Sequence, residues 1–263
     1  NISIRKLHFT YSYNNTDLFE LNIDQLDIFS GNFLSILGPN GSGKSTLLKI
    51  IANLLPYTTG SILIKDIELN KYNIKDFSRL VAYVPQKTFT IFPFSVYEVV
   101  MMGRTPYQNL MAFETELDRK IVNETLELFE IQHLKHKGLN EISGGEVQRV
   151  MIARALVQEP QIILLDEPNA HLDLEHQIST FNLLRRMNVE QGITIVNVSH
   201  DLNLVGIYST EIAFMKGGKM KMMGEKTSVL SKENIKEIFN VETEILCTKD
   251  GAQKHVIVKP INN

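Results

Sequence analysis

The sequence has no tryptophan, a single cysteine and no long run of apolar residues. Cys247 cannot form an internal disulfide, which is typical of a chain in a reducing compartment, and we expect it to be a small core residue. Apolar runs such as residues 162–165 fall far short of the roughly 20 residues that a membrane-spanning helix needs. Any role at a membrane would therefore depend on a partner.

An excess of one charge is also lacking. The chain has 27 lysines and arginines against 30 aspartates and glutamates, which gives a formal charge of −3. Without a general excess of basic residues, nucleic acid is not expected as a main partner. With 263 residues, 43% of them hydrophobic, the chain can bury a core as one large domain or two small ones.

The stretch GPNGSGKST at residues 38–46 is rich in glycine and ends in Lys-Ser-Thr. The apolar residues 33–37 before it are typical of a buried strand, and residues 44–55, bounded by Pro56, are typical of a helix. A glycine-rich loop in this position directs backbone N–H groups toward phosphate, and the helix N-terminus adds positive potential. We therefore expect a polyphosphate site, the alternative being an ordinary strand-to-helix turn.

Individual residues of this loop have distinct expected roles. The ammonium group of Lys44 would reach the β- and γ-phosphates, and the hydroxyl of Ser45 would bind Mg²⁺. The glycines let the backbone turn tightly and approach oxygens that a Cβ would obstruct. The predicted nucleotide contacts in this loop are Gly38, Asn40, Gly41, Ser42, Gly43, Lys44, Ser45 and Thr46.

A second pattern, IILLDE at residues 162–167, ends an apolar strand with two carboxylates. In open α/β sheets, ligands bind at the carboxyl ends of the strands. Asp166 is therefore suited to hold Mg²⁺, and Glu167 to orient or activate the attacking water. The pattern alone is common, but its position downstream of the glycine-rich loop makes it a specific indication of phosphoryl chemistry.

A third pattern, ISGGEVQR at residues 142–149, indicates the start of a helix. Ser143 is a plausible N-cap, and Gly144 and Gly145 leave backbone amides bare at the helix start. The alternative interpretation is a well-capped helix with no further role.

The rest of the chain alternates between strand and helix patterns. This alternation predicts an α/β fold with a mostly parallel sheet covered by helices. The first thirty residues have the alternation of half-exposed antiparallel strands. Further strands are expected at 61–69, 79–85, 161–168, 192–201 and 210–224, helical structure at about 95–140, and a closing hairpin that turns at 249–251.

Taken together, these motifs resemble those of the ATP-binding-cassette (ABC) ATPase family over nearly the whole chain. Residues 38–45 resemble Walker A, residues 142–146 the family signature, and residues 162–167 Walker B. The resemblance implies three further elements. They are a Q-loop glutamine, Gln86, which touches the metal and faces a transmembrane partner, a D-loop at 170–173 that ends in Asp173, and a switch histidine, His200, which contacts the γ-phosphate.

The resemblance also implies an architecture. Residues 1–263 would form one ABC ATPase domain with a P-loop NTPase core and an N-terminal antiparallel β subdomain. A helical subdomain is expected at about 95–158 and a C-terminal β-hairpin extension at about 240–263. The aromatic ring that stacks on adenine would be Tyr11 or Tyr13, and the Phe-x-Tyr pattern favours Tyr11.

Two departures from the family pattern stand in the signature. Ile142 replaces the usual leucine and Glu146 the usual glutamine. Neither change touches the serine and glycine contacts, so we expect activity to survive. His171 and His176 flank the D-loop and are expected to position it, whereas His133 and His136 are expected to be solvated.

In this family the signature lies too far from its own Walker A loop to complete one site. The resemblance therefore implies a head-to-tail homodimer in which each ATP lies between Lys44 of one copy and Ser143 and Gly145 of the other. Product charge would reopen the dimer after hydrolysis. The implied catalytic residues are Glu167, His200, Gln86 and Lys44, and the implied Mg²⁺ contacts are Ser45, Gln86 and Asp166.

Residues 92–107, FPFSVYEVVMMGRTPY, resemble the importer ATPases for iron–siderophore complexes, haem and cobalamin. There this stretch belongs to the groove that grips the permease. The resemblance implies an ATPase at the cytoplasmic face of a membrane, bound to permease subunits and indirectly to a substrate-binding protein. Alternatives are a molybdate or zinc/manganese importer, or a soluble ABC ATPase of iron–sulfur cluster assembly. Locally, the alternative is a helix that ends at Gly103, with Arg104 as a surface cation.

Overall fold

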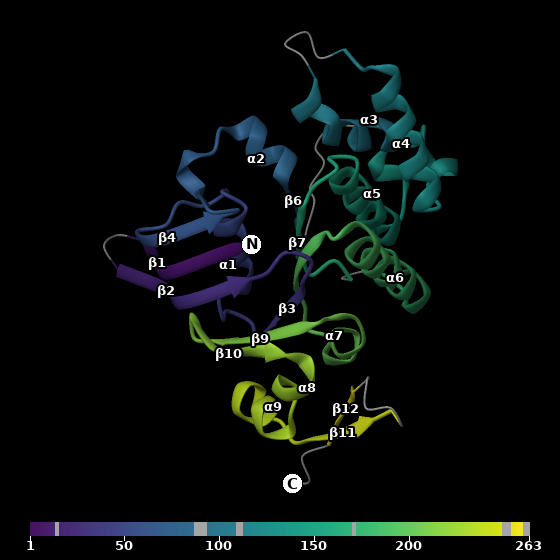
Figure 1. Ribbon diagram of the computed structural model, residues 1–263. Helices are drawn as coiled ribbons and strands as arrows, with labels where there is room; N and C mark the ends of the chain where they lie inside the picture. Colours follow the sequence, from purple (N-terminus) through teal and green to yellow (C-terminus); the bar gives the residue numbers. More distant parts are fainter. Residues whose placement is uncertain (14–15, 87–93, 109–112, 170–171, 249–253, 260–263) are drawn as a thin grey trace. The chain divides into compact units, whose positions relative to one another are not determined.

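The computed structural model describes residues 1–13, 16–86, 94–108, 113–169, 172–248 and 254–259, without the side chains of 13 and 16–18 (Figure 1). The chain divides into two compact units. One unit comprises Asn1–Lys71 and Thr194–Asn263, and the other comprises Tyr72–Ile193. Within the described residues, no helix is both long and apolar enough to cross a bilayer.

The first unit begins with antiparallel strands, as the alternating sequence predicts. Ile2 and Ile4 are buried on one face of β1, because successive side chains of a strand point to opposite sides. An irregularity at Lys6, which has φ 47°, shifts the alternation so that Leu7 and Phe9 are buried in turn. β1 pairs with β2 on one side and with β4 on the other, and the purple to blue ribbons of Figure 1 show these strands together. Their bounds are β1 Ile2–Tyr13, β2 Thr16–Ile28, β4 Thr59–Ile64 and β5 Ile67–Glu68, followed by the short 3-10 helix η1, Leu69–Lys71.

Three fully or largely buried strands form the parallel part of this unit. β3 (Phe33–Leu37) lies between β8 (Thr194–Val198) and β9 (Glu211–Lys216) and is parallel to both. β10 (Lys219–Glu225) returns antiparallel to β9. The strand order in this unit is β5-β4-β1-β2-β10-β9-β3-β8.

The helix after the glycine-rich loop is shorter than predicted. α1 spans Lys44–Ile51 instead of 44–55. It ends because Ala52 leaves helical geometry and Asn53 adopts a left-handed conformation with φ 57°, the usual way for a helix to stop.

The C-terminal part of the first unit packs helices and a hairpin around β9. β11 and β12 pair antiparallel, as predicted, while the turn at 249–251 lies outside the described residues. Cys247 is exposed, so its assignment to the core was wrong: it is the last residue of β11 and stands opposite Lys254, the first residue of β12, beyond the packed Ile245. The bounds are α7 Leu202–Tyr208, α8 Lys226–Val229, α9 Lys232–Phe239, β11 Thr243–Cys247 and β12 Lys254–Val258.

The second unit combines a parallel strand pair with helices. β6 pairs parallel with β7, and α3 contacts α4 and α5. β6 begins at Val81, because residues 79 and 80 still belong to α2. The bounds are α2 Ile74–Leu80, β6 Val81–Val84, α3 Val96–Met101, η2 Met102–Tyr107, α4 Glu116–Leu128, η3 Gln132–Leu134, η4 Leu139–Glu141, α5 Gly144–Leu156, β7 Ile162–Asp166 and α6 Leu174–Gln191.

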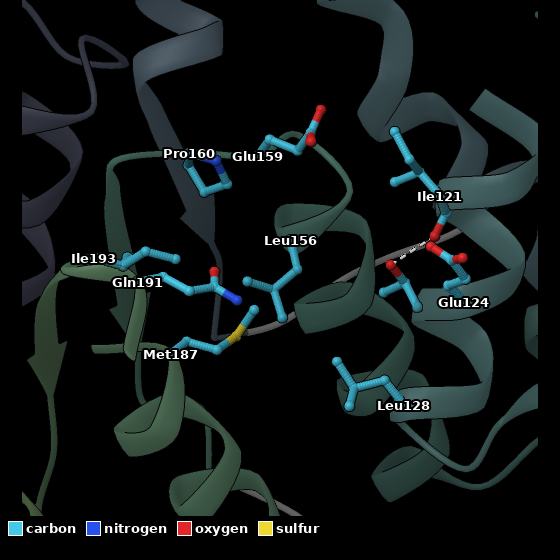
Figure 2. A pocket seen from close by; sticks show the side chains of 10 residues that line it. Ile121, Glu124, Leu128, Leu156, Glu159, Pro160, Met187, Gln191 and Ile193 are labelled. Carbon is cyan, nitrogen blue, oxygen red and sulfur yellow. Dashed lines mark hydrogen bonds between the residues drawn. The ribbon is translucent and has the colours of Figure 1, made fainter. Parts of the chain in front are cut away.

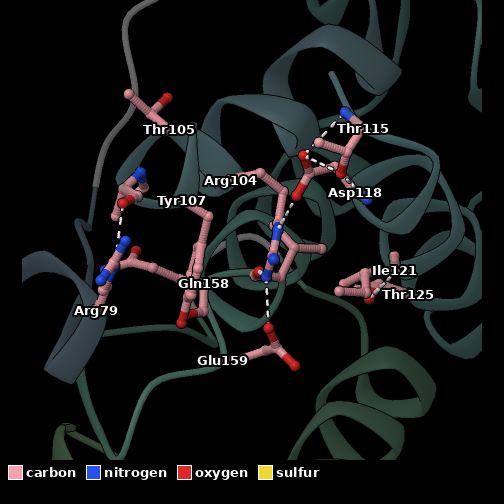
Figure 3. A network of polar contacts seen from close by, with 12 residues as sticks. Arg79, Arg104, Thr105, Tyr107, Thr115, Asp118, Ile121, Thr125, Gln158 and Glu159 are labelled. Atoms are coloured by element: carbon pink, nitrogen blue, oxygen red, sulfur yellow. Dashed lines mark hydrogen bonds and ion pairs between the residues drawn. The ribbon is translucent and has the colours of Figure 1, made fainter. Parts of the chain in front are cut away.

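Arg104 is at the centre of a buried ionic network in the second unit (Figure 3). Its side chain is 3% exposed, and Nε donates to Asp118 Oδ1 at 2.8 Å. Nη1 donates to Glu159 Oε2 at 2.6 Å and to the carbonyl of Val157 at 2.7 Å. The guanidinium carbon lies 4.0 Å from the ring centroid of Tyr107. The network therefore joins η2, the N-terminus of α4 and the segment after α5.

These contacts correct both sequence interpretations of Arg104. It is neither a surface cation nor available to grip a partner protein, because its donors are used inside the unit. Gly103 has a related role: a Cβ there would lie 2.2 Å from the carbonyl oxygen of Arg154 in α5. The Gly-Arg pair thus lets η2 pack backbone to backbone against α5. Phe92, at the start of the predicted docking stretch, lies outside the described residues.

Replacing Arg104 by alanine should lower the free energy of unfolding by about 3–5 kcal/mol, because it leaves the buried Asp118 carboxylate without its cation. Urea denaturation measures the change. The matched control is Arg119→Ala, whose ion pair with Glu114 is at the surface and should contribute roughly 0–1 kcal/mol. Equal losses in the two variants would contradict the structural role of Arg104.

The same network predicts a pH dependence. Burial alone would raise the pKa of Asp118, but hydrogen bonds from Arg104 and Thr115 outweigh it and hold the pKa below its usual value. The resulting stability is present above the unfolded pKa of about 3.9 and is lost as pH falls through the lower folded value. The stability gap between wild type and Asp118→Asn should therefore narrow below about pH 4. A gap that stays constant in urea titrations at several pH values would contradict this.

Candidate functional site

The predicted site residues divide between the two units, and in each unit some of them lie at the carboxyl end of a parallel strand pair. In the first unit, Ile36 of β3 pairs with Val198 of β8. Gly38 and His200 each follow that pair by two positions. The parallel register thus places the start of the glycine-rich loop and the histidine at the same edge of the sheet.

The glycine-rich loop packs closely against its own unit. A Cβ on Gly38 would lie 2.1 Å from the carbonyl oxygen of Met215. Gly43, the residue before α1, has φ 98°, and a Cβ there would lie 2.8 Å from Phe19 Cζ. Only glycine fits either position without displacing the loop. The loop conformation is thereby fixed by packing as well as by sequence.

Polar groups of this loop point to an anionic ligand. Lys44 is 5% exposed, and its ammonium group donates to the carbonyls of Gly38 at 2.8 Å and Pro39 at 3.1 Å, so it lies over the loop. The hydroxyl of Ser42 is buried and has no hydrogen-bond partner among the described residues. A buried hydroxyl without a partner costs free energy unless a ligand satisfies it. Asn40 and Gly41 are exposed, and Ser45 and Thr46 are half-buried in the first turn of α1.

His200 is exposed, but its neighbours on both sides are fixed. Ser199 is fully buried, and its N–H donates to Ile36 at 3.2 Å. The carboxylate of Asp201 caps α7. The imidazole is therefore presented from a rigid backbone at the strand edge.

Two residues, Tyr11 and Tyr13, are candidates for the aromatic ring that stacks on adenine. Tyr11 is 40% exposed and packs edge to face on Phe9, with ring centroids 4.6 Å apart. Its exposed ring is available for stacking. The side chain of Tyr13 lies outside the described residues.

In the second unit, β6 and β7 bring three predicted residues together. Val84 pairs with Leu165, and Gln86 and Glu167 each follow by two positions. Gln86 Nε2 donates to Glu167 Oε2 at 2.5 Å, and Asp166 precedes them as the last residue of β7. Glu167 has φ 51°, a left-handed conformation unusual outside glycine. Strained residues of this kind are concentrated at functional sites.

The sequence did not single out Tyr83, which also belongs to this group. Its hydroxyl donates to Asp166 Oδ2 at 3.3 Å. Burial and the negative charge of Asp166 raise the pKa of Tyr83, so the phenol stays protonated and remains a donor. The only available signal was its position, because Tyr83 is the polar residue in an otherwise apolar strand.

The signature residues and the D-loop aspartate line one pocket of about 490 Å³ in the second unit. Ser143 caps α5, as predicted, and its own N–H donates to Glu146 Oε2 at 2.7 Å in a capping box. This backbone hydrogen bond lowers the pKa of Glu146, so the replacement of glutamine keeps a charged acceptor at the cap. The lining residues are Ser143, Gly144, Gly145, Glu146, Arg149, Asp173 and His176.

His176 holds Asp173 within this pocket, since its Nδ1 lies 2.6 Å from Asp173 Oδ1 and its backbone N–H donates to the same oxygen. These hydrogen bonds lower the pKa of Asp173. The other D-loop histidine, His171, lies outside the described residues, and His133 and His136 are exposed.

A second pocket of about 550 Å³ lies among α4, the end of α5 and the end of α6 (Figure 2). Its walls are largely aliphatic, with Leu128, Leu156 and Met187 facing one another. Glu124 and Glu159 stand at its edge, and Glu159 is paired with Arg104. Among the described residues that line it, none is a predicted site residue.

Comparison with known proteins identifies related sequences. The profile of a family described as ABC transporter matches residues 21–170. YvrA of Bacillus subtilis, an uncharacterized ABC transporter ATP-binding protein, is 35% identical over 91% of this chain, which spans only 54% of that protein. The petrobactin import ATP-binding protein FpuC of Bacillus anthracis is 33% identical over 96% of this chain and 90% of its own length. The hemin import ATP-binding protein HmuV of Gloeobacter violaceus is 38% identical over 84% and 82%.

Solved structures of ABC transporter proteins have the same fold as this chain. An inward-facing ABC transporter described as metal-chelate type aligns with a TM-score of 0.84 and 28% identity, over 99% of this chain and 98% of the other. The dimeric bacterial ABC transporter cassette MJ0796 aligns with a TM-score of 0.77 and 32% identity, over 86% and 99%. The α/β fold with a P-loop NTPase core is thereby confirmed.

Replacing Gly43 by alanine should weaken ATP binding by at least about tenfold, since the added Cβ would collide with Phe19 and displace the loop. Titration with a fluorescent ATP analogue measures the change. Gly192→Ala is the matched control: Gly192 also has a positive φ, 69°, but a Cβ there meets nothing within 4 Å. Unchanged affinity in Gly43→Ala, or equal losses in both variants, would contradict the role of the loop.

Proposed function

Because the chain belongs to the ABC transporter family and is an ATPase, we propose that it energises uptake of an iron complex or similar metal chelate. The observation that carries this proposal is the alignment of 99% of the chain, C-terminal segment included, with a metal-chelate type transporter. The names of relatives that import petrobactin and hemin support the same class of cargo. A siderophore, haem or cobalamin would enter through a separate permease, with this chain at the cytoplasmic face.

The proposed nucleotide site starts from the glycine-rich loop. The backbone amides of Gly41, Ser42 and Gly43 bind phosphate oxygens, and Lys44 turns from the loop carbonyls to the β- and γ-phosphates. The hydroxyl of Ser42 gains a partner. Gly38, Asn40 and Thr46 shape the loop around the phosphates, and Tyr11 stacks on adenine.

The proposed metal is Mg²⁺. Its protein donors would be Ser45, Asp166 and Gln86, an all-oxygen set of the kind that Mg²⁺ prefers. The hydrogen bond that Tyr83 donates to Asp166 fits this assignment, because it orients the carboxylate while leaving it charged. When bound, the metal would neutralise charge on the β- and γ-phosphates.

Hydrolysis is assigned to residues at the strand edges. Glu167 would orient and deprotonate the attacking water, while Gln86 holds that carboxylate in place. His200 would contact the γ-phosphate from its fixed backbone. These groups supply positioning and electrostatic stabilisation, the main contributions to phosphoryl transfer.

We infer that two copies complete each site. The pocket lined by Ser143, Gly144, Gly145 and Asp173 is exposed on the second unit and offers backbone amides at the start of α5. Those amides and the N-terminus of α5 suit the γ-phosphate of an ATP held by another copy. The alignment with a dimeric cassette supports the pairing of two copies, and the head-to-tail orientation is part of our proposal.

The permease would dock on the α3 region. Arg104 contributes to this surface only through its packing, as its donors are internal. The candidates are Phe94, which is 38% exposed, and the half-buried Tyr97, whose ring lies under Lys135 Nζ at 4.7 Å. A substrate-binding protein would join through the permease. The alternative of a soluble ATPase in iron–sulfur cluster assembly predicts no such docking, and an importer of molybdate or zinc/manganese predicts a different cargo.

Glu167→Gln should bind ATP normally but hydrolyse it about 100-fold more slowly or worse, because the amide still accepts from Gln86 but cannot take a proton. ATP should then hold the variant as a dimer, which light scattering detects. Glu175→Gln, an exposed change in the first turn of α6, is the control and should leave turnover unchanged. Full turnover in Glu167→Gln would remove this residue from the role.

The importer assignment is tested by tagging Glu167→Gln, solubilising native membranes in mild detergent with ATP, and identifying co-purifying proteins by mass spectrometry. We expect a polytopic permease and, through it, a substrate-binding protein that binds a metal chelate. Recovery of soluble scaffold proteins alone, with the chain absent from membranes, would favour the iron–sulfur alternative.

A further inference from the structure

The C-terminal hairpin of β11 and β12 lies against α7, the helix that begins two residues after His200. Asn203, in the first turn of α7, uses both ends of its amide on one residue of β12. Its Oδ1 accepts from the N–H of Val256 at 2.7 Å, and its Nδ2 donates to the carbonyl of Val256 at 3.3 Å. The side chain thus pairs with β12 as a neighbouring strand would.

Gly206 explains how the two backbones come so close. A Cβ there would lie 2.6 Å from the carbonyl oxygen of Lys254 in β12. Glycine inside a helix costs about 1 kcal/mol relative to alanine, and the close approach to β12 offsets that cost. Lys254 in turn donates from Nζ to the carbonyl of Leu230 at 2.9 Å, at the end of α8. β12 is therefore held at Lys254 both by its packing on α7 and by its hydrogen bond to the end of α8.

The hairpin also enters the core next to the glycine-rich loop. Val256 is 6% exposed and belongs to one buried cluster with Val205 of α7 and Leu37, the last residue of β3 before the loop. Displacing the hairpin would therefore open the core on which α7 rests.

His200 depends on α7 for one of its two anchors. On its N-terminal side, Ser199 is bonded to β3. On its C-terminal side, Asp201 donates its N–H to Ser199 Oγ at 3.0 Å and accepts from the N–H groups of Asn203 and Leu204, both at 2.9 Å. Asn203 therefore links two structures: the Asp201 cap, which fixes the backbone after His200, and strand β12.

We propose that the C-terminal hairpin positions His200 for hydrolysis, with Asn203 and Gly206 as positioning residues that lock α7 against β12. This inference rests on the proposed role of His200 and goes beyond it by assigning a task to the C-terminal hairpin. Changes at Asn203 and Gly206 should act on the rate of hydrolysis more than on the binding of ATP, because both residues contact β12 from α7, whereas the loop that holds the phosphates packs on Met215 and Phe19.

The test compares Gly206→Ala and Asn203→Ala with Leu246→Ser. Leu246 is half-exposed, and its side chain alternates with that of the packed Ile245, so the change alters the hairpin away from α7. We expect kcat to fall about tenfold or more in the first two variants, since small displacements of a catalytic group have effects of this size. The dissociation constant of a fluorescent ATP analogue should change by less than about twofold in all three.

A double-mutant cycle with His200→Ala separates positioning from general destabilisation. Single-turnover hydrolysis of radiolabelled ATP resolves the slow rates. If the hairpin acts through His200, adding Gly206→Ala to His200→Ala should slow hydrolysis no further. Additive losses, or full kcat in both Gly206→Ala and Asn203→Ala, would overturn the inference while leaving the proposed function intact. Full kcat in His200→Ala would refute the proposed role of His200 itself, and the inference with it.

Discussion

The register of two parallel strand pairs is the constraint on which the candidate site depends. Ile36 opposite Val198 places Gly38 and His200 at one strand edge, and Val84 opposite Leu165 places Gln86 and Glu167 at another. A slip of one residue in either pair would turn these side chains to the other face of the sheet. β3, β7 and β8 are buried along their whole length, so such a slip would draw flanking residues such as the exposed Gln161 before β7 into the core.

Glycine residues also allow the backbones of neighbouring elements to pack closely at several points of the structure. Gly38 lets the glycine-rich loop pack on Met215, Gly103 lets η2 pack on α5, and Gly206 lets α7 pack on β12. In each case a side chain would force two elements apart. Beside Gly103, Arg104 adds a buried cation that satisfies acceptors from α4 and from the segment after α5. At each of these junctions the close packing limits sliding of one element along the other.

Much of the fold and of the candidate site could be predicted from the sequence, because at the motifs the residues that suggest the chemistry also determine the local backbone structure. Strand, glycine-rich loop and helix follow one another at residues 33–51, and Ser143 caps its helix with Glu146 as the pattern requires. The predictions were wrong where contacts between residues distant in sequence determine whether a side chain is buried. Arg104 looked exposed because its partners Asp118 and Glu159 are distant in sequence. Asn203 gave no local signal, and Tyr83 gave only its position as the polar residue of an apolar strand, since the roles of both depend on strands that pair or pack from elsewhere in the chain.

In the arrangement that we propose, two copies of this chain build each ATP site, with the glycine-rich loop of one facing the signature of the other. Mixing Lys44→Ala with Ser143→Arg, each inactive alone, and measuring ATP hydrolysis tests it most directly. In a head-to-tail dimer, the mixed pair has one site in which both defects meet and one site that is intact. If two copies share each site, mixing restores hydrolysis; a mixture as inactive as its two components would contradict the shared site.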